Sequence, residues 1–150
     1  MIKIVLDTNI VFSAILNSSS RIGKIILQSK NYFQFYSCDY LKIEILKHRN
    51  KLQKLTKLDE FELVELEVLI TANINFINEG ILPKELIKKT LTLLNDIDPN
   101  DTPFVALAEH LDAQLWTGDL KLYNGLKSRK FKNIMNTTDI LLLIDSLENH

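Results

Sequence analysis

The sequence predicts an α/β protein: a three-layer α/β/α sandwich around a central parallel sheet of four to five strands. Short apolar runs rich in β-branched or aromatic residues recur along the chain, as in strands that are buried on both faces of a sheet. Helical patterns lie between these runs, and this alternation is typical of parallel sheets. The composition, 46% apolar and 25% charged with four Gly and three Pro, is that of a globular domain.

The predicted strands are the apolar runs. The first ends at Asp7, and the later ones are bounded by polar residues. The runs span residues 2–6, 33–38, 74–77, 113–116 and 133–135.

The predicted helices carry start and stop signals. Pro83 suits a first helical turn, Asp59 and Asp101 can cap helix N-termini, and Gly125 can end the turn that follows Asp119. The helical patterns span residues 20–29, 39–49, 59–72, 83–95, 102–111 and 138–147.

Residues 59–95 contain two amphipathic helical patterns with only a brief strand-like run between them. This region could project from the sheet as a helical arm. Two interpretations stay open for its apolar residues: they belong to the core, or part of their surface packs against a partner chain. The residues concerned are Leu63, Leu66, Ile70 and Leu86.

The length of 150 residues predicts one domain over residues 1–150. A net charge of -1 makes no global case for a nucleic-acid or membrane partner. Cys38 is the only cysteine, so no internal disulfide can form, and His48, His110 and His150 show no zinc spacing. There is no run of 18 apolar residues, so we expect neither a signal peptide nor a membrane span, and a cytoplasmic location.

Four carboxylates stand where an α/β site would form. Asp7 and Asp119 directly follow predicted strands, Asp101 begins a predicted helix, and Glu44 lies inside another. In an open parallel sheet, sites form outside the carboxyl ends of the strands. We therefore expect these acids at one edge of the sheet.

Each acid also has a structural interpretation. Asp7 and Asp101 could be helix caps, Asp119 a turn residue, and Glu44 a helix-surface residue paired with a base one turn later. Together, however, clustered carboxylates repel one another unless a cation neutralises them. Oxygen ligands without Cys or His select Mg²⁺ or Mn²⁺, which can activate water and clamp the oxygens of a phosphodiester.

Four segments carry a family resemblance. Asp-Thr-Asn at 7–9, Glu44, the segment 98–108 and Trp-Thr-Gly-Asp at 116–119 resemble, in order and spacing, the acidic motifs of PIN-domain ribonucleases. The resemblance covers nearly the whole chain. It is closest to the short PIN toxins (VapC-like) of prokaryotic toxin–antitoxin pairs.

This resemblance implies a metal-dependent endoribonuclease that cuts RNA. It implies metal binding by Asp7, Glu44, Asp101 and Asp119, with Mg²⁺ or Mn²⁺ as cofactor. It also implies an antitoxin partner and a possible homodimer. The supporting polar residues that it implies are Thr8, Asn9 and Thr117. Asp98 is a further acid one turn before Asp101, and we favour Asp101 because it begins the helix, as in the family.

Basic residues are concentrated in two stretches. Residues 42–57 contain six Lys or Arg and one acid, and residues 121–132 contain five and none. Both follow proposed site residues, so we expect them to hold phosphates, although two solvated helix faces would show the same pattern. Tyr123 could stack on a base or pack against Leu126. The predicted RNA contacts are Lys47, Arg49, Lys51 and Lys121.

Other functions fit the sequence less well. A phosphatase of the haloacid dehalogenase kind needs a second Asp where the chain has Asn9, and a receiver domain needs a Lys where it has Thr117. No Gly-rich nucleotide loop is present. A PIN-like domain that binds RNA or scaffolds a complex without catalysis stays an alternative, although all four acids argue against it.

Overall fold

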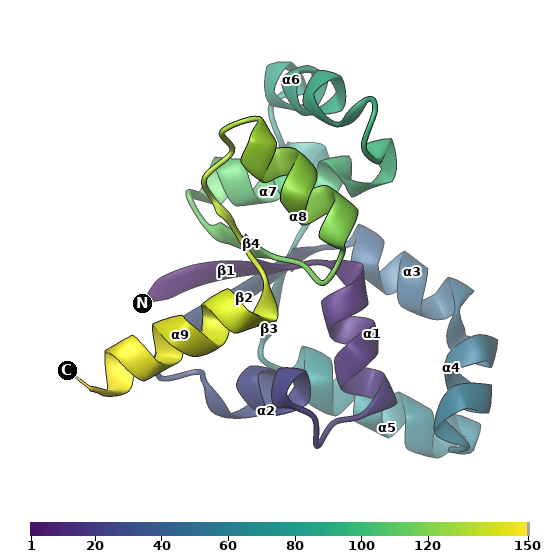
Figure 1. The fold of residues 1–150 in the computed structure, drawn as a ribbon. Coiled ribbons are helices and arrows are strands. Elements are labelled where there is room, and N and C mark those ends of the chain that lie inside the picture. Colours follow the sequence, from purple (N-terminus) through teal and green to yellow (C-terminus); the bar gives the residue numbers. More distant parts are fainter. Residues whose placement is uncertain (150) are drawn as a thin grey trace.

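A computed structural model describes residues 1–149 and contains one five-stranded parallel sheet, which confirms the predicted fold class (Figure 1). The strands are β1 (Ile2–Leu6), β2 (Phe33–Cys38), β3 (Ile74–Ile77), β4 (Gln114–Trp116) and β5 (Ile134–Met135). Their spatial order is β3-β2-β1-β4-β5, so β1 lies in the middle, between β2 and β4.

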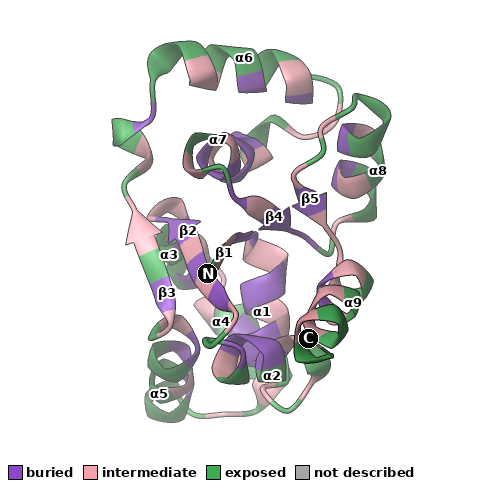
Figure 2. Ribbon diagram, turned by 90° about the vertical axis from the view of Figure 1, so that its left-hand side faces the viewer, coloured by how far each residue is buried: buried purple, intermediate pink, exposed green. Residues whose placement is uncertain are grey.

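Helices cover both faces of this sheet. Figures 1 and 2 show α6, α7 and α8 on one side, and α1, α2, α5 and α9 on the other. The helices are α1 (Thr8–Leu16), α2 (Arg21–Gln28), α3 (Tyr40–Lys47), α4 (Arg49–Thr56), α5 (Glu60–Thr71), α6 (Lys84–Leu94), α7 (Thr102–Leu111), α8 (Leu120–Ser128) and α9 (Thr137–Glu148). Two short 3-10 turns are η1 (Glu79–Ile81) and η2 (Pro99–Asp101).

The core lies between the sheet and these helices (Figure 2). Leu63 and Ile70 of α5 are fully buried, and Leu66 and Leu86 are partly buried against the core. In addition, β3 pairs with β2, and α5 packs against α1 and α2. Residues 59–95 are therefore part of the sandwich and form no projecting arm.

The predicted helices differ from the structure in three places. The helices α1, α4 and α8 were not predicted, and the expected helix over 39–49 ends at Lys47, with α4 beginning at Arg49. Gly125 lies inside α8, so the prediction that it ends a turn was wrong. Its role is close packing, because a Cβ there would lie 2.6 Å from Cδ1 of Ile97. Asp59 caps α5 as predicted, in a reciprocal capping box with Glu62.

Within residues 1–149 no single helix is long and apolar enough to cross a membrane. Only α1 and α2 taken together reach the required length and composition, and these two helices are bent by 103°.

Candidate functional site

The structure brings the predicted acids to the carboxyl edge of the sheet. Asp7 joins β1 to α1, and Asp119 joins the neighbouring strand β4 to α8. Glu44 lies in α3, which follows β2, and Asp101 stands where η2 passes into α7. The adjacent positions of β1 and β4 therefore bring Asp7 and Asp119 together. After burial, the negative charge of Asp119 is a further cause of the raised pKa of Asp7.

Asp7 is buried and held rigidly. Its Oδ1 accepts a hydrogen bond from the Thr8 backbone N–H at 2.8 Å. Its Oδ2 accepts from the Thr117 hydroxyl at 2.7 Å and from the Asn9 amide at 3.2 Å. Burial raises the pKa of Asp7, and these hydrogen bonds counteract the rise because they stabilise the ionised form.

The loop between β4 and α8 completes this network. The Gly118 backbone N–H donates to Oδ1 of Asn9 at 2.8 Å, and the Asp119 N–H donates to the Thr117 hydroxyl at 3.0 Å. A Cβ on Gly118 would lie 3.2 Å from Asn9 Oδ1, so a side chain there would crowd this contact. Of the predicted polar residues, Asn9 and Thr117 thus bind Asp7 through their side chains, and Thr8 through its backbone.

Asp101 is not the helix cap that its position allows. It occupies the N-cap position of α7, yet its side chain makes no capping hydrogen bond. Its Oδ2 is buried and has no hydrogen-bond partner within residues 1–149. Burial, followed by the negative charges of Asp7, Asp98, Asp119 and Glu44, raises the pKa of Asp101 to about 8. The acids therefore lie within electrostatic range of one another.

Asp98 and Glu44 have additional contacts of their own. Asp98 Oδ1 accepts from the Asn100 N–H at 3.0 Å and so closes the η2 turn. A Glu44 oxygen lies 3.5 Å from Nε2 of His48, one helical turn on. A hydrogen bond to Glu44 is the main cause of the raised pKa of Tyr40, one turn before it. Of the two neighbouring aspartates, Asp101 therefore has the unsatisfied oxygen.

A divalent cation fits this donor set chemically. Among residues 1–149, no three Asp, Glu, His or Cys side chains stand at the spacing of a ready-made metal site. An unpaired buried carboxylate oxygen among several negative charges is nevertheless costly, and a cation would relieve the cost. The oxygen-only ligands suit Mg²⁺ or Mn²⁺.

The four side chains that are predicted to contact RNA differ in whether they are free to bind a phosphate. Lys47, Lys51 and Lys121 are exposed. Arg49 is engaged elsewhere: its guanidinium donates to both carboxylate oxygens of the buried Glu67, at 2.5 and 3.3 Å. This ion pair joins α4 to α5, so Arg49 has a structural role that its place in a basic stretch concealed.

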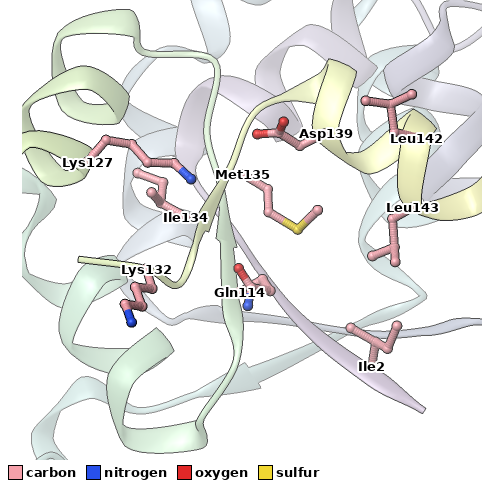
Figure 3. Close-up of a pocket in the computed structure, with 9 residues that line it drawn as sticks. All are labelled: Ile2, Gln114, Lys127, Lys132, Ile134, Met135, Asp139, Leu142 and Leu143. Carbon is pink, nitrogen blue, oxygen red and sulfur yellow. The ribbon is translucent and has the colours of Figure 1, made fainter. Parts of the chain in front are cut away.

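Two pockets lie near β5. One, of about 240 Å³, borders Thr117 and Asp119 of the acid network. The other, of about 480 Å³, lies between α9 and the β5 side of the sheet (Figure 3). It is mainly apolar and includes Met135 and Leu143, with Lys127 and Lys132 beside them, and it contains none of the predicted acids.

Sequence reasoning missed two neighbours of the acid cluster. The Ser37 hydroxyl donates to the Leu6 carbonyl at 2.9 Å and so fixes β2 beside the residue before Asp7. Gly118 matters for its small size, as described above. No sequence pattern indicated a role for Ser37. The short spacing between the end of the predicted strand 113–116 and Asp119, however, could have indicated the tight loop that contains Gly118.

Comparisons with known proteins agree with this architecture. A sequence model of the PIN domain matches residues 5–139. No curated protein sequence matches the chain significantly.

Solved structures share the fold at low sequence identity. A chain of VapBC2 from Rickettsia felis, solved bound to a DNA fragment from their promoter, is 15% identical, with TM-score 0.71 over 90% of this chain and 98% of that one. PAE2754 from Pyrobaculum aerophilum is 10% identical, with TM-score 0.70 over 97% and 96%.

A chain of VapBC-1 from nontypeable Haemophilus influenzae is 19% identical, with TM-score 0.61 over 91% of this chain and 99% of that one. Two of these three neighbours are thus VapBC proteins. Together with the sequence match over most of the chain, the shared fold shows that this protein belongs to the PIN domain family.

Proposed function

We propose that this protein is a cytoplasmic, metal-dependent endoribonuclease and the toxin of a toxin–antitoxin pair. The observation that carries the proposal is the unpaired, buried Oδ2 of Asp101 among four other acids on a PIN fold. Membership of the family and the VapBC neighbours support a nuclease and an antitoxin partner.

Asp7, Asp101 and Asp119, with Glu44, would hold Mg²⁺ or Mn²⁺. When bound, the cation supplies an activated water and stabilises negative charge on the phosphate oxygens. Thr117 and Asn9 keep the Asp7 carboxylate in one orientation through hydrogen bonds of 2.7 and 3.2 Å. Asp7, Asp119 and Glu44 lie within electrostatic range of Asp101, and a bound cation would offset the repulsion between these carboxylates.

The exposed Lys47, Lys51 and Lys121 would bind RNA phosphates on either side of the acids. Arg49 is left out of this set because it is paired with Glu67. One observation favours the alternative of an RNA-binding PIN domain without catalysis: no three acidic, His or Cys groups among residues 1–149 stand at metal-ligand spacing.

We also propose that a second copy of this chain binds to the α3–α5 face. This face is defined by six exposed apolar side chains: Ile43, Leu46, Phe61, Val64, Val68 and Leu69. Exposed apolar patches of this kind mark interaction sites. The helix α5 carries four Glu and no base, whereas Lys42, Lys54 and Lys57, which are not assigned to RNA, make residues 42–57 basic. A two-fold axis would therefore set unlike charges opposite each other.

The nuclease proposal is tested by incubating purified protein with single-stranded RNA in Mg²⁺, Mn²⁺ or EDTA. We expect cleavage with either metal and none with EDTA, and loss of cleavage in Asp7→Asn. A Lys88→Gln variant, changed at an exposed site on α6, serves as the control and should cleave normally. Equal cleavage in EDTA, or by Asp7→Asn, would contradict the proposal.

A further inference from the structure

A small pocket of about 240 Å³ opens beside the acid cluster, between the N-terminal ends of α8 and α9. It shares Thr117 and Asp119 with the acid network. The lining residues are Thr117, Gly118, Asp119, Leu120, Tyr123, Asn136, Thr137 and Thr138. A group bound here would therefore lie next to a phosphate held at the acids.

The described side chains that line this pocket carry no positive charge, which disfavours binding of a phosphate. No Lys, Arg or His lines it within the described part of the chain, and Asp119 contributes negative charge. Its volume is below the roughly 300–1,000 Å³ of pockets for drug-sized ligands. A single neutral, polar ring fits these limits better than an anion or a larger ligand.

The polar side chains that line the pocket have mainly hydrogen-bond donors that are not used in contacts within the protein. Asn136 Oδ1 accepts from the Asp139 N–H at 2.8 Å, which leaves its amide group as a donor. Thr137 Oγ1 accepts from the Trp116 indole N–H at 3.1 Å, which leaves its hydroxyl proton to donate. The hydroxyl of the exposed Thr138 also lines the pocket and can donate or accept.

Tyr123 adds an aromatic ring to the pocket. Lys127 Nζ lies over this ring, 5.4 Å from its centroid, so a base would stack on the opposite face. The Tyr123 hydroxyl donates to Asp139 Oδ2 at 2.8 Å, and this bond ties the ring of α8 to α9. Unpaired bases of RNA stack on such rings, and their edges are read by hydrogen bonds. Donors in the pocket suit a base whose edge presents carbonyl oxygens.

We propose that this pocket receives one unpaired uracil base, whose edge presents carbonyl oxygens, from the single-stranded RNA substrate. The inference rests on the proposed nuclease function for the identity of the ligand. It makes Asn136, Thr137 and Thr138 determinants of sequence preference, with Tyr123 as the stacking surface.

Asn136→Asp is the variant that tests the hydrogen-bond donor of the pocket most directly. Asp caps a helix about as well as Asn, so α9 keeps its N-terminus while the amide donor becomes a carboxylate oxygen. Asn17→Asp is the matched control, because it makes the same chemical change at the far end of α1, where Asn17 Oδ1 accepts from the Ser19 N–H. Tyr123→Leu, compared with Tyr123→Phe, tests stacking.

Binding is measured in EDTA by fluorescence anisotropy with labelled oligo-uridylate and oligo-adenylate, so that cleavage plays no part. We expect the parent and Asn17→Asp to prefer oligo-uridylate about tenfold, the discrimination typical of base-edge hydrogen bonds. Asn136→Asp should bring the ratio of the two affinities close to one. Tyr123→Leu should weaken binding to both oligonucleotides, and Tyr123→Phe should not.

A parent without base preference, or an Asn136→Asp protein with the same preference as the parent, would overturn the proposal. So would the absence of binding to either oligonucleotide. The nuclease proposal is judged separately. Metal-dependent cleavage without base preference would contradict only the proposed base-binding pocket. Base preference without cleavage would contradict only the proposed nuclease activity.

Discussion

Asp101 is the residue whose surroundings are most at odds with a purely structural role. A cap would accept a backbone N–H, and Asp101 does not. Burial and four neighbouring acids raise its pKa to about 8, so it is mostly protonated at neutral pH when no cation is bound. Binding of a divalent cation must therefore displace a proton, and metal affinity should rise with pH up to this range.

The raised pKa of Asp101 predicts how stability depends on pH in EDTA. The folded value of about 8 exceeds the unfolded value of 3.8, so between these limits the native state binds more protons than the unfolded state. The free energy of unfolding should then fall as pH rises from 5 to 8. Urea unfolding across this range should show a shallower fall for Asp101→Asn than for the parent. Parallel curves for the two proteins would contradict the assigned shift.

The same substitution separates a metal ligand from a cap. In EDTA, Asp101→Asn should unfold at the same temperature as the parent at neutral pH, where Asp101 is already mostly protonated. Above pH 8 it should unfold at a higher temperature, because the parent then carries one more repelling charge. Metal at 100 times its dissociation constant adds about 2.7 kcal/mol, or roughly 5–10 °C for a domain of this size. Thermal unfolding with and without Mn²⁺ should show a smaller metal-induced shift in the mutant. Equal shifts would remove Asp101 from the metal site.

Among the secondary-structure elements, α3, α4 and α8 carry the basic residues that we assign to RNA. Replacing Lys47, Lys51 and Lys121 by Gln should lower affinity for all RNA sequences alike. It should also reduce the slope of log K against log salt by about 0.7 per lost phosphate contact, or roughly 2 in total. Filter binding at several salt concentrations gives the slope.

The control for this experiment is a triple variant with the same change in charge. Lys24, Lys30 and Lys88 are also exposed, and they lie on α2, before β2 and on α6. Their replacement by Gln should leave the slope of log K against log salt within about 0.7, the contribution of one phosphate contact, of the parent value. If both triple variants lose the same slope, RNA binding follows net charge and not this surface.

The strands were predictable because each is a short apolar run in a buried parallel sheet. The predicted ranges 2–6, 33–38 and 74–77 agree with the structure. The last two strands, β4 and β5, each begin one residue later than predicted. The helix α1 was missed because apolar residues also lie outside its buried face: Phe12 is only partly buried and Leu16 is exposed, which blurs the amphipathic period. The helix α8 was missed because tertiary packing against Ile97, and not a turn, accounts for Gly125.

Part of the site followed from the topology alone. Asp7 and Asp119 follow adjacent strands, so the sheet-edge rule was enough to bring them together. The sequence could not reveal that Glu67 pairs with Arg49, because the partners come from different helices 18 residues apart. Nor could it separate Asp98, which closes a turn, from Asp101, which has the unpaired oxygen. Both distinctions depend on side-chain contacts across elements.

At the scale of the whole molecule, the α3–α5 face predicts self-association. Val64 and Val68 each line two adjoining pockets on this face, so its apolar surface is continuous. Val68→Glu places a charge at its centre, at a side chain that is 62% exposed and therefore not needed for folding. Light scattering after gel filtration should give about twice 17.3 kDa for the parent and the monomer mass for the variant.

The matched control for that experiment is Leu142→Glu, which charges a 64% exposed Leu on α9 that lines the pocket of Figure 3. It should remain dimeric. A monomeric parent, or a dimeric Val68→Glu protein, would contradict the proposed interface.

The acids at the carboxyl edge of the sheet are proposed to bind a divalent cation. Anomalous diffraction from crystals of the protein grown with Mn²⁺ would locate this ion. We expect a peak at coordination distance, about 2.0–2.2 Å, from carboxylate oxygens of Asp7, Asp101 and Asp119. Crystals with saturating Mn²⁺ and no peak at these side chains would contradict the account.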